Sequence, residues 1–356
     1  MNSLTNHTIF ITGAAGYVGA MLADQFSNRP SVVNIICLDK NPQPELLKSN
    51  KKIKWIRANI ADDSWQKEVA ECKPTVIIHC AWQIREMYGQ KRKQWQWNVV
   101  GSEKVAALAL STSSVERFIH FSTASIYGAY LSNTLSHFFK ESEPMREEEY
   151  LYGIEKKQAE ENLTQLLRER KGKGERVPDV FIVRPAAITG PRGRSMSGRF
   201  GLQSALSGKL KGSLVYSFVR LMVSFVPATP LWCRQFVHED DVVDIVTQLS
   251  FSENLPHFEI FNLTPSGPVV RPADMAKAVN KKFVIVPPSV VRVAFFFFWH
   301  LTRGKIPTSR GGWKFYSYPV VMDGTKVTTL LGYAYRFESK EAFSEHKGRY
   351  AERYGT

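Results

Sequence analysis

The sequence predicts an α/β fold: a doubly wound parallel sheet with a smaller C-terminal lobe. Short apolar runs rich in β-branched residues alternate with helix-length amphipathic segments along the first half of the chain. A glycine-rich turn separates the first apolar run from the first amphipathic segment. This alternation is typical of a sheet with parallel strands and with helices on both faces.

Six segments are predicted to be buried strands because they are short, apolar and bounded by polar or turn-forming residues. In chain order they are HTIFIT (7–12), VVNIICL (32–38), KIKWIRA (52–58), TVIIHCA (75–81), RFIHFS (117–122) and DVFIVRP (179–185). Helices are predicted between them, near residues 17–27, 62–72, 92–113 and 152–171. Ligands of such sheets bind beyond the carboxyl ends of the strands, so the residues that follow each strand are the candidates for a site.

The glycine-rich turn, TGAAGYVG, places Gly13, Gly16 and Gly19 directly after the first strand. Gly13 can make the tight turn, Gly16 lets the backbone approach a pyrophosphate, and Gly19 lets the helix pack closely on the strand. Asp39 follows the second strand, where a carboxylate can accept both ribose hydroxyls and repel a 2′-phosphate. The pattern predicts a Rossmann-type site that prefers NAD to NADP, with the neighbouring Lys40 as the group that would favour NADP.

Tyr152 and Lys156 are four residues apart on a predicted helix, so their side chains share one face. A tyrosine titrates near pH ~10, and a neighbouring ammonium together with a cationic nicotinamide favours the phenolate. Tyr152 is therefore a candidate general base for an alcohol, or a general acid for a carbonyl. The alternative is an ordinary surface pair, but the glycine-rich turn upstream favours the catalytic interpretation.

Further motifs follow in chain order: HCAW (79–82), NVVGS (98–102), FSTASIYG (121–128), RPAAITGP (184–191), RQFVHEDDV (234–242) and VVMDGTKVTTLLGY (320–333). Together with TGAAGYVG and YGIEK, they resemble the motifs of the extended short-chain dehydrogenase/reductases, the NAD-dependent epimerase/dehydratase family. The resemblance covers about residues 7–335. It implies an NAD-binding domain over 1–185, completed by about 235–265, and a substrate-binding lobe formed by 186–234 and 266–356.

The resemblance also implies roles for single residues. Thr123 would hold the substrate oxygen while Tyr152 moves the proton, and Lys156 would lower the Tyr152 pKa and bind the nicotinamide ribose. Ser125 and Arg234 would contact the substrate. The residues implied to contact NAD are Gly13, Gly16, Tyr17, Val18, Gly19, Asp39, Lys40, Asn59, Ile60, Cys80, Ala81, Asn98, Tyr152, Lys156 and Pro185.

Some of these positions allow more than one interpretation. Asn59 stands where the family has an Asp beside the adenine, so it keeps an acceptor but loses the charge. Ala81 would support the pyrophosphate. Asn98 either orders the helix near the nicotinamide or is an interior Asn bonded to backbone. Arg234 either meets substrate phosphates, as in sugar-nucleotide members, or is an arginine at the rim that bonds carbonyl groups.

Departures from the family pattern limit the reaction. Sugar-nucleotide dehydratases of the family carry Thr-Asp-Glu where this chain has Thr123, Ala124 and Ser125. Since both acids are missing, dehydration is disfavoured, and hydride transfer remains, either as net oxidation or reduction or as epimerisation. Ala187 replaces an Asn that contacts the substrate in many sugar-nucleotide members. That substitution favours a different substrate.

The chain carries a formal net charge of +14, and the excess of basic residues lies after residue 150. Two stretches there, residues 180–238 and 283–322, contain no Asp or Glu. This asymmetry indicates either an anionic partner or a solvated basic face. The basic residues form no recognised nucleic-acid-binding motif, so we expect a small-molecule substrate and no nucleic acid. We also expect no metal, because the acids and histidine at 238–241 would point to different faces.

The acid-free C-terminal stretch contains the run AFFFFWHLTRGKIPTSRGGWK (294–314). A helix that is apolar all round is usually buried in a core. The basic residues Arg303, Lys305, Arg310 and Lys314 also fit a helix lying on an anionic membrane. A third interpretation is the wall of an apolar pocket, and the sequence leaves all three open.

Three functions therefore stay open. The first is an NAD-dependent oxidoreductase or epimerase acting on a nucleotide sugar, and the second is the same chemistry on a hydrophobic lipid- or sterol-like alcohol. The third is a non-catalytic NAD-binding sensor or scaffold. Four cysteines without C-x-x-C spacing, no visible signal peptide and no apolar run of about eighteen residues favour a cytoplasmic protein. Contact with the inner face of a membrane and a homodimer are left open.

Overall fold

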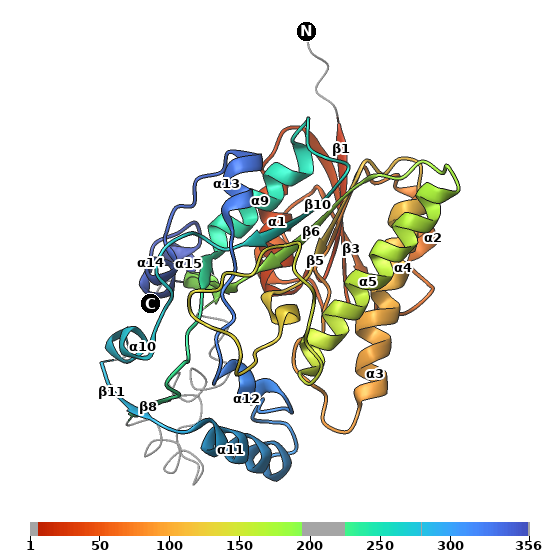
Figure 1. Cartoon of the computed structure of the whole chain (residues 1–356). Coiled ribbons are helices and arrows are strands. Elements are labelled where there is room, and N and C mark those ends of the chain that lie inside the picture. The colour runs from red at the N-terminus through yellow and green to blue at the C-terminus, as the bar shows by residue number, and fades with distance from the viewer. Residues whose placement is uncertain (1–5, 194–224, 279, 355–356) are drawn as a thin grey trace.

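The computed structural model describes residues 6–193, 225–278 and 280–354. Its centre is a seven-stranded sheet in which all neighbouring strands are parallel (Figure 1). In spatial order the strands are β10 (Phe258–Leu263), β6 (Asp179–Pro185), β5 (Arg117–Phe121), β4 (Val76–His79), β1 (His7–Thr12), β2 (Val32–Asp39) and β3 (Ile53–Arg57). The predicted doubly wound α/β fold is confirmed.

All six predicted strands are strands of this sheet. β4 ends at His79, earlier than the predicted end at residue 81, so Cys80 and Ala81 lie in the loop beyond it. The seventh strand, β10, pairs with β6 and comes from the segment 235–265 that was expected to complete the sheet. The division into an NAD-binding domain and a lobe stays a prediction.

Helices cover both faces of the sheet (Figure 1). α1 (Tyr17–Ser27) packs against α9 (Glu239–Phe251) on one face, and α4 (Gly101–Ser111) packs against α5 (Leu151–Gly172) on the other. Successive strand residues point to opposite faces. For that reason each strand contributes to two separate hydrophobic cores, one on each side of the sheet.

The segment predicted as one helix near 92–113 is α3 (Lys91–Trp95), a π-helical turn η2 (Gln96–Val100) and then α4. The remaining short elements of the first half are η1 (Glu45–Leu47), α2 (Gln66–Glu71), η3 (Ala124–Tyr127) and β7 (Ala187–Thr189). Those of the second half are β8 (Phe225–Ala228), β9 (Phe236–His238), α10 (Pro272–Ala278), β11 (Lys282–Ile285), α11 (Pro288–Leu301), α12 (Gly312–Phe315), α13 (Thr325–Leu331), α14 (Ser339–Ser344) and α15 (Ala351–Tyr354). Within the described ranges, every helix is too short or too polar to traverse a bilayer.

A buried ion pair joins α5 to the sheet. Arg184 on β6 donates to both carboxylate oxygens of Glu160 on α5, and both side chains are almost completely buried. Arg184 also donates to the Tyr127 hydroxyl at 2.8 Å and to the Glu141 carbonyl at 3.0 Å. These bonds join α5 to β6, the strand that carries Arg184.

The order of the strands creates a crevice. β1 lies between β2 and β4, so the chain leaves β1 toward one edge of the sheet and later returns on the other side. Helices on opposite faces then separate at the carboxyl ends of β1 and β4. The glycine-rich turn after β1 and the loop after β4 therefore border the same opening.

Candidate active site

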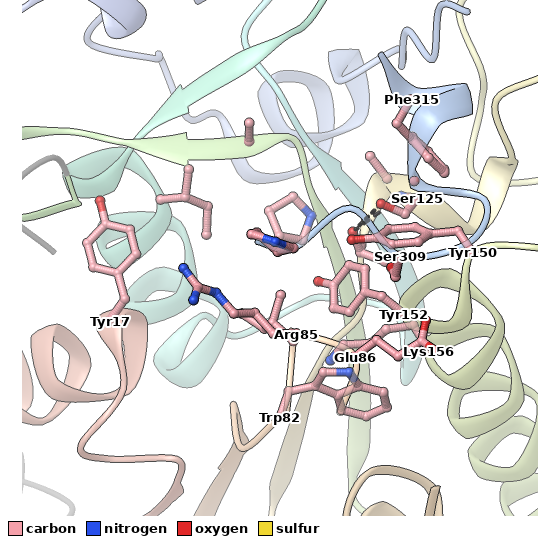
Figure 2. A pocket seen from close by; sticks show the side chains of 18 of the residues that line it. Tyr17, Trp82, Arg85, Glu86, Ser125, Tyr150, Tyr152, Lys156, Ser309 and Phe315 are labelled. Atoms are coloured by element: carbon pink, nitrogen blue, oxygen red, sulfur yellow. Dashed lines mark hydrogen bonds between the residues drawn. The ribbon is translucent and has the colours of Figure 1, made fainter. Parts of the chain in front are cut away.

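A cavity of about 1390 Å³ lies beyond the carboxyl ends of the strands. It extends from the glycine-rich turn past the start of α5 to the inner side of α11. Every residue predicted to bind the cofactor or substrate, or to act in catalysis, lines this cavity. Figure 2 shows part of it, with Tyr17 on one side and Tyr150 and Tyr152 on the other.

The glycine-rich turn has the shape that a dinucleotide requires. Gly13 has a positive φ of 71°, and a Cβ there would lie 2.6 Å from the backbone of Ala81. The Gly16 amide donates to the Gly13 carbonyl, and α1 begins at the next residue. Only glycine fits at Gly13, so the backbone of the turn forms a side-chain-free wall at the start of α1, suited to a pyrophosphate.

The three candidate catalytic side chains and the candidate substrate residue Ser125 come from adjacent elements. Thr123 follows β5, and its hydroxyl accepts the Ser125 amide at 3.2 Å and lies 3.4 Å from the Ser125 hydroxyl. Tyr152, in the first turn of α5, lines the same cavity, and the Thr123 side chain is near enough to lower the pKa of its phenol. Lys156 lies one turn further along α5 and is also buried. The structure therefore brings together the hydroxyls and the ammonium that the sequence predicted to act together.

Burial dominates the electrostatics of this group. It raises the pKa of Tyr152, and the hydrogen bond with Thr123 partly offsets that effect. Burial also lowers the pKa of Lys156 to about 7, against opposite contributions from Cys80 and Glu160. Such perturbed groups in one cavity are typical of catalytic sites.

The expected lowering of the Tyr152 pKa by Lys156 is not seen. The Lys156 ammonium donates to the Phe121 carbonyl and lies 3.7 Å from the centre of the Trp82 ring. It is therefore engaged by backbone and by an indole, which leaves burial as the main influence on Tyr152. Trp82 was missed by sequence reasoning, although HCAW differs at this position from the H-x-A-A of the family it resembles.

A protein-family model matches more than half of the chain. Residues 9–264 match the model described as the NAD dependent epimerase/dehydratase family. The chain belongs to this family. The family is NAD-dependent, and NAD is the cofactor.

Solved structures of other proteins share this fold. MoeE5, in complex with UDP-glucuronic acid and NAD, is 17% identical with a TM-score of 0.67, covering 95% of this chain and 97% of that chain. WbmG of Bordetella bronchiseptica, in complex with NAD, is 22% identical with a TM-score of 0.66, covering 98% and 95%. A UDP-glucose 4-epimerase of Thermotoga maritima, solved with UDP-glucose, is 19% identical with a TM-score of 0.67, covering 95% and 96%.

Among curated proteins, an uncharacterized protein of Mycobacterium tuberculosis is 23% identical over 352 residues, which are 96% of this chain and 84% of the relative. A UDP-glucose 4-epimerase of Mycolicibacterium smegmatis is 31% identical over 124 residues, 33% of this chain and 39% of the relative. The likeness to a named enzyme is therefore partial, and it leaves the substrate open.

Asp39 connects the glycine turn to the end of β2 in this member of the epimerase/dehydratase family. Its Oδ2 accepts the Ala15 amide at 3.0 Å, and its Oδ1 accepts the backbone and side-chain amides of Asn41. The Lys40 ammonium lies 4.1 Å from the centre of the Trp97 ring and 3.2 Å from the Gln83 side-chain oxygen. A carboxylate held at this place fits the ribose of NAD better than a 2′-phosphate.

We expect the protein to bind NAD(H) at least about tenfold more tightly than NADP(H), because a 2′-phosphate would meet the Asp39 charge. Calorimetry with both cofactors measures the ratio. Asp39→Asn keeps an oxygen for the Ala15 amide but removes the charge, so it should bring the affinities for NAD(H) and NADP(H) closer together. Lys40→Gln is the matched control and should leave it unchanged. Equal affinities in the wild type would contradict the assignment and make Lys40 a phosphate ligand.

The positions predicted near the adenine and nicotinamide are engaged within the protein. The Asn59 side-chain oxygen accepts the Ala61 amide at 3.0 Å, while Ile60 is buried. Asn98, in the π-helical turn, accepts the Gln83 amide at 2.7 Å and donates to the Gln83 carbonyl and to Glu155. Asn98 thus fixes the loop that follows β4, which agrees with the interpretation of an interior Asn bonded to backbone.

The candidate substrate side of the cavity includes Arg234. Its backbone pairs with Val270 in both directions, and its guanidinium lies 5.6 Å from the centre of the Tyr316 ring. Among the described lining residues from 227 onward, Arg234 is the one charged side chain. The others are mostly large and apolar, and they include the inner face of α11.

Glu86 is an acid in the cavity wall that sequence reasoning missed. Its side chain is only 5% exposed, and its Oε2 is buried without a hydrogen-bond partner among the described residues. Burial raises its pKa, against opposite effects of Lys91 and Ser309. The sequence signal that could have identified Glu86 is its position in the loop just beyond β4, because ligands of a parallel sheet bind beyond the carboxyl ends of the strands. Glu86 is available as an acceptor for a substrate hydroxyl.

Proposed function

We propose that the protein transfers a hydride between an alcohol or ketone carbon of its substrate and NAD, with Tyr152 exchanging the proton. NAD, when bound, supplies or accepts the hydride. The observation that carries the proposal is the position of the Tyr152–Thr123 pair. The pair lies in the wall of the cavity, between the glycine-rich turn on one side and a large apolar chamber on the other.

The side chains divide the work between orientation and proton transfer. The Thr123 and Ser125 hydroxyls can hold the reacting oxygen beside the Tyr152 phenol. Because burial raises the Tyr152 pKa, the neutral phenol is well suited to donate a proton to a carbonyl that is being reduced. In the oxidative direction, the interaction with the Thr123 side chain favours the phenolate that accepts the alcohol proton.

Neither Ala124 nor Ser125 can act as the acid that drives elimination of water in dehydratases of the family. This absence supports net oxidation or reduction, or epimerisation, rather than dehydration. Epimerisation would need the oxidised intermediate to rotate in the apolar chamber, which is one part of the cavity of about 1390 Å³.

The lining favours a substrate with an apolar body. A nucleotide sugar carries two phosphates, yet outside the residues expected to bind NAD the described lining offers two cations, Arg85 and Arg234, and from residue 227 onward Arg234 stands alone among side chains such as Trp232, Phe298 and Phe315. Burying a diphosphate without paired charges is costly. Arg234 and the UDP-sugars bound in two of the structural relatives support the second candidate, a UDP-sugar. We favour a hydrophobic alcohol or ketone.

A substrate panel separates the two candidates. We expect NAD(H)-linked turnover with sterol, isoprenoid or long-chain alcohols and ketones, and little turnover or tight binding with UDP-glucose or UDP-glucuronic acid. Arg234→Gln serves as the discriminating variant: it should abolish use of a UDP-sugar but barely change turnover of an apolar ketone. Efficient conversion of a UDP-sugar that depends on Arg234 would overturn our preference. No turnover with any compound, despite tight NAD binding, would favour the non-catalytic sensor.

A further inference from the structure

Helix α11 has two apolar faces. Val291, Ala294, Phe295 and Phe298 line the cavity from one side of the helix. The opposite side exposes large apolar side chains at helical spacing, and these form what we term the outer face. The outer face consists of Val293 (55% exposed), Phe296 (61%), Phe297 (63%) and Leu301 (81%).

These exposures correct the first interpretation of the Phe run. A buried core helix would hide all of its apolar side chains, but Trp299 is the one buried side chain of α11. Figure 1 shows α11 at the end of the molecule opposite the N-terminus, away from the central sheet. A contiguous exposed apolar face at such a position is typical of a surface that contacts a partner or a membrane.

The charges near the outer face are all positive. No Asp or Glu occurs between Asp274 and Asp323, a stretch that contains the whole of α11. Arg303, Lys305 and Arg310 follow the carboxyl end of α11 and are exposed. Within the described part of the chain, none of these three takes part in an ion pair.

Lys314, the fourth cation of this stretch, differs from the other three. Its ammonium lies 2.6 Å from the Glu149 carboxylate, and only 13% of its side chain is exposed. It therefore holds the segment before α5 and is not available to an external anion. The cationic edge of the outer face consists of Arg303, Lys305 and Arg310.

We propose that the outer face of α11 docks on an anionic lipid bilayer. Phe296, Phe297 and Leu301 would enter the boundary between headgroups and acyl chains, and the cationic edge would contact anionic headgroups. A second copy of the chain fits this surface less well, because a symmetric contact would bring both cationic edges together. The proposal rests on α11 alone and does not depend on the catalytic function.

Docking through α11 would connect the bilayer to the cavity. The helix that touches lipid is also a wall of the apolar chamber, so its two faces would border lipid and substrate. An enzyme with an apolar substrate gains from this arrangement because such a substrate is concentrated in the membrane.

Vesicle sedimentation tests the proposal with the full-length protein. We expect binding to phosphatidylcholine vesicles that contain phosphatidylserine, little binding to pure phosphatidylcholine, and release as salt is raised. The triple variant Arg303→Gln, Lys305→Gln, Arg310→Gln should bind at least about tenfold more weakly. Phe296→Ser, Phe297→Ser should also lose binding, although its net charge is unchanged.

The matched control is Lys51→Gln, Lys171→Gln, Lys173→Gln, which removes the same charge from exposed positions elsewhere. It should retain most of the binding. Equal loss in both triple variants would mean a non-specific effect of net charge and would overturn the proposal, as would a wild type that ignores anionic vesicles. Light scattering tests the alternative occupant, a second copy of the chain. A dimer that is abolished by Phe296→Ser, Phe297→Ser would make the outer face a protein interface. Calorimetry with NAD shows separately whether each variant is folded.

Discussion

Replacing Tyr152 by Phe should lower turnover by about 10²-fold or more. The change removes the proton that the phenol would exchange with the reacting oxygen in the proposed reaction. It keeps the aromatic ring in the first turn of α5. NAD affinity should stay within a few-fold of wild type, because the glycine turn and Asp39 are untouched. Steady-state kinetics and calorimetry on the same preparation measure the two effects separately.

Tyr150→Phe is the matched control for this experiment. The Tyr150 ring lies 5.8 Å from the Tyr152 ring and also lines the cavity, but the residue four positions after Tyr150 is Ile154 rather than a lysine. We expect the turnover number of Tyr150→Phe to change little, and we expect any effect of the change to appear in KM. If Tyr152→Phe retained near wild-type turnover, or if Tyr150→Phe lost as much, the assignment of the proton donor would be wrong.

Glu160→Gln should be among the most destabilising single changes in the chain. It leaves the Arg184 guanidinium buried without a counter-charge, and breaking a buried pair in this way costs about 3–5 kcal/mol. Denaturant unfolding followed by circular dichroism should show a clearly lower midpoint. Tyr152 lies on the same helix, so partial loss of activity is also expected.

The comparison for Glu160→Gln is Glu45→Gln. Glu45 pairs with Lys48 at 2.6 Å, but both side chains are largely exposed, and such pairs contribute little to stability. The unfolding midpoint of Glu45→Gln should match wild type. An equally small effect of Glu160→Gln would show that the buried pair does not hold α5 on the sheet.

Much of the fold could be predicted because its signals are local. The strands are short apolar runs buried on both faces, and the turn after β1 needs glycine at Gly13, whose positive φ and contact with Ala81 exclude a side chain. The cofactor side of the cavity follows from the same logic, since residues after parallel strands meet at one edge. All the residues predicted there line the cavity.

Other features depend on contacts between distant segments. Lys314 pairs with Glu149, which is far away in the sequence. For that reason the sequence alone placed Lys314 among the cations available to an anionic membrane, although its charge is already paired. The two faces of α11 have nearly the same composition, and only the tertiary structure decides which one borders the cavity and which is exposed. The Trp82 indole beside Lys156 likewise follows from the loop after β4 folding over α5.

The central claim is hydride transfer between NAD and a carbon held beside Tyr152. Its most direct test is to supply the protein with NADH that carries deuterium at the transferable position, together with the preferred ketone of the panel. Mass spectrometry of the product should show deuterium bound to carbon with wild type and almost none with Tyr152→Phe. A wild-type protein that binds NADH tightly, yet never transfers deuterium to a ketone or a UDP-sugar intermediate, would contradict the account.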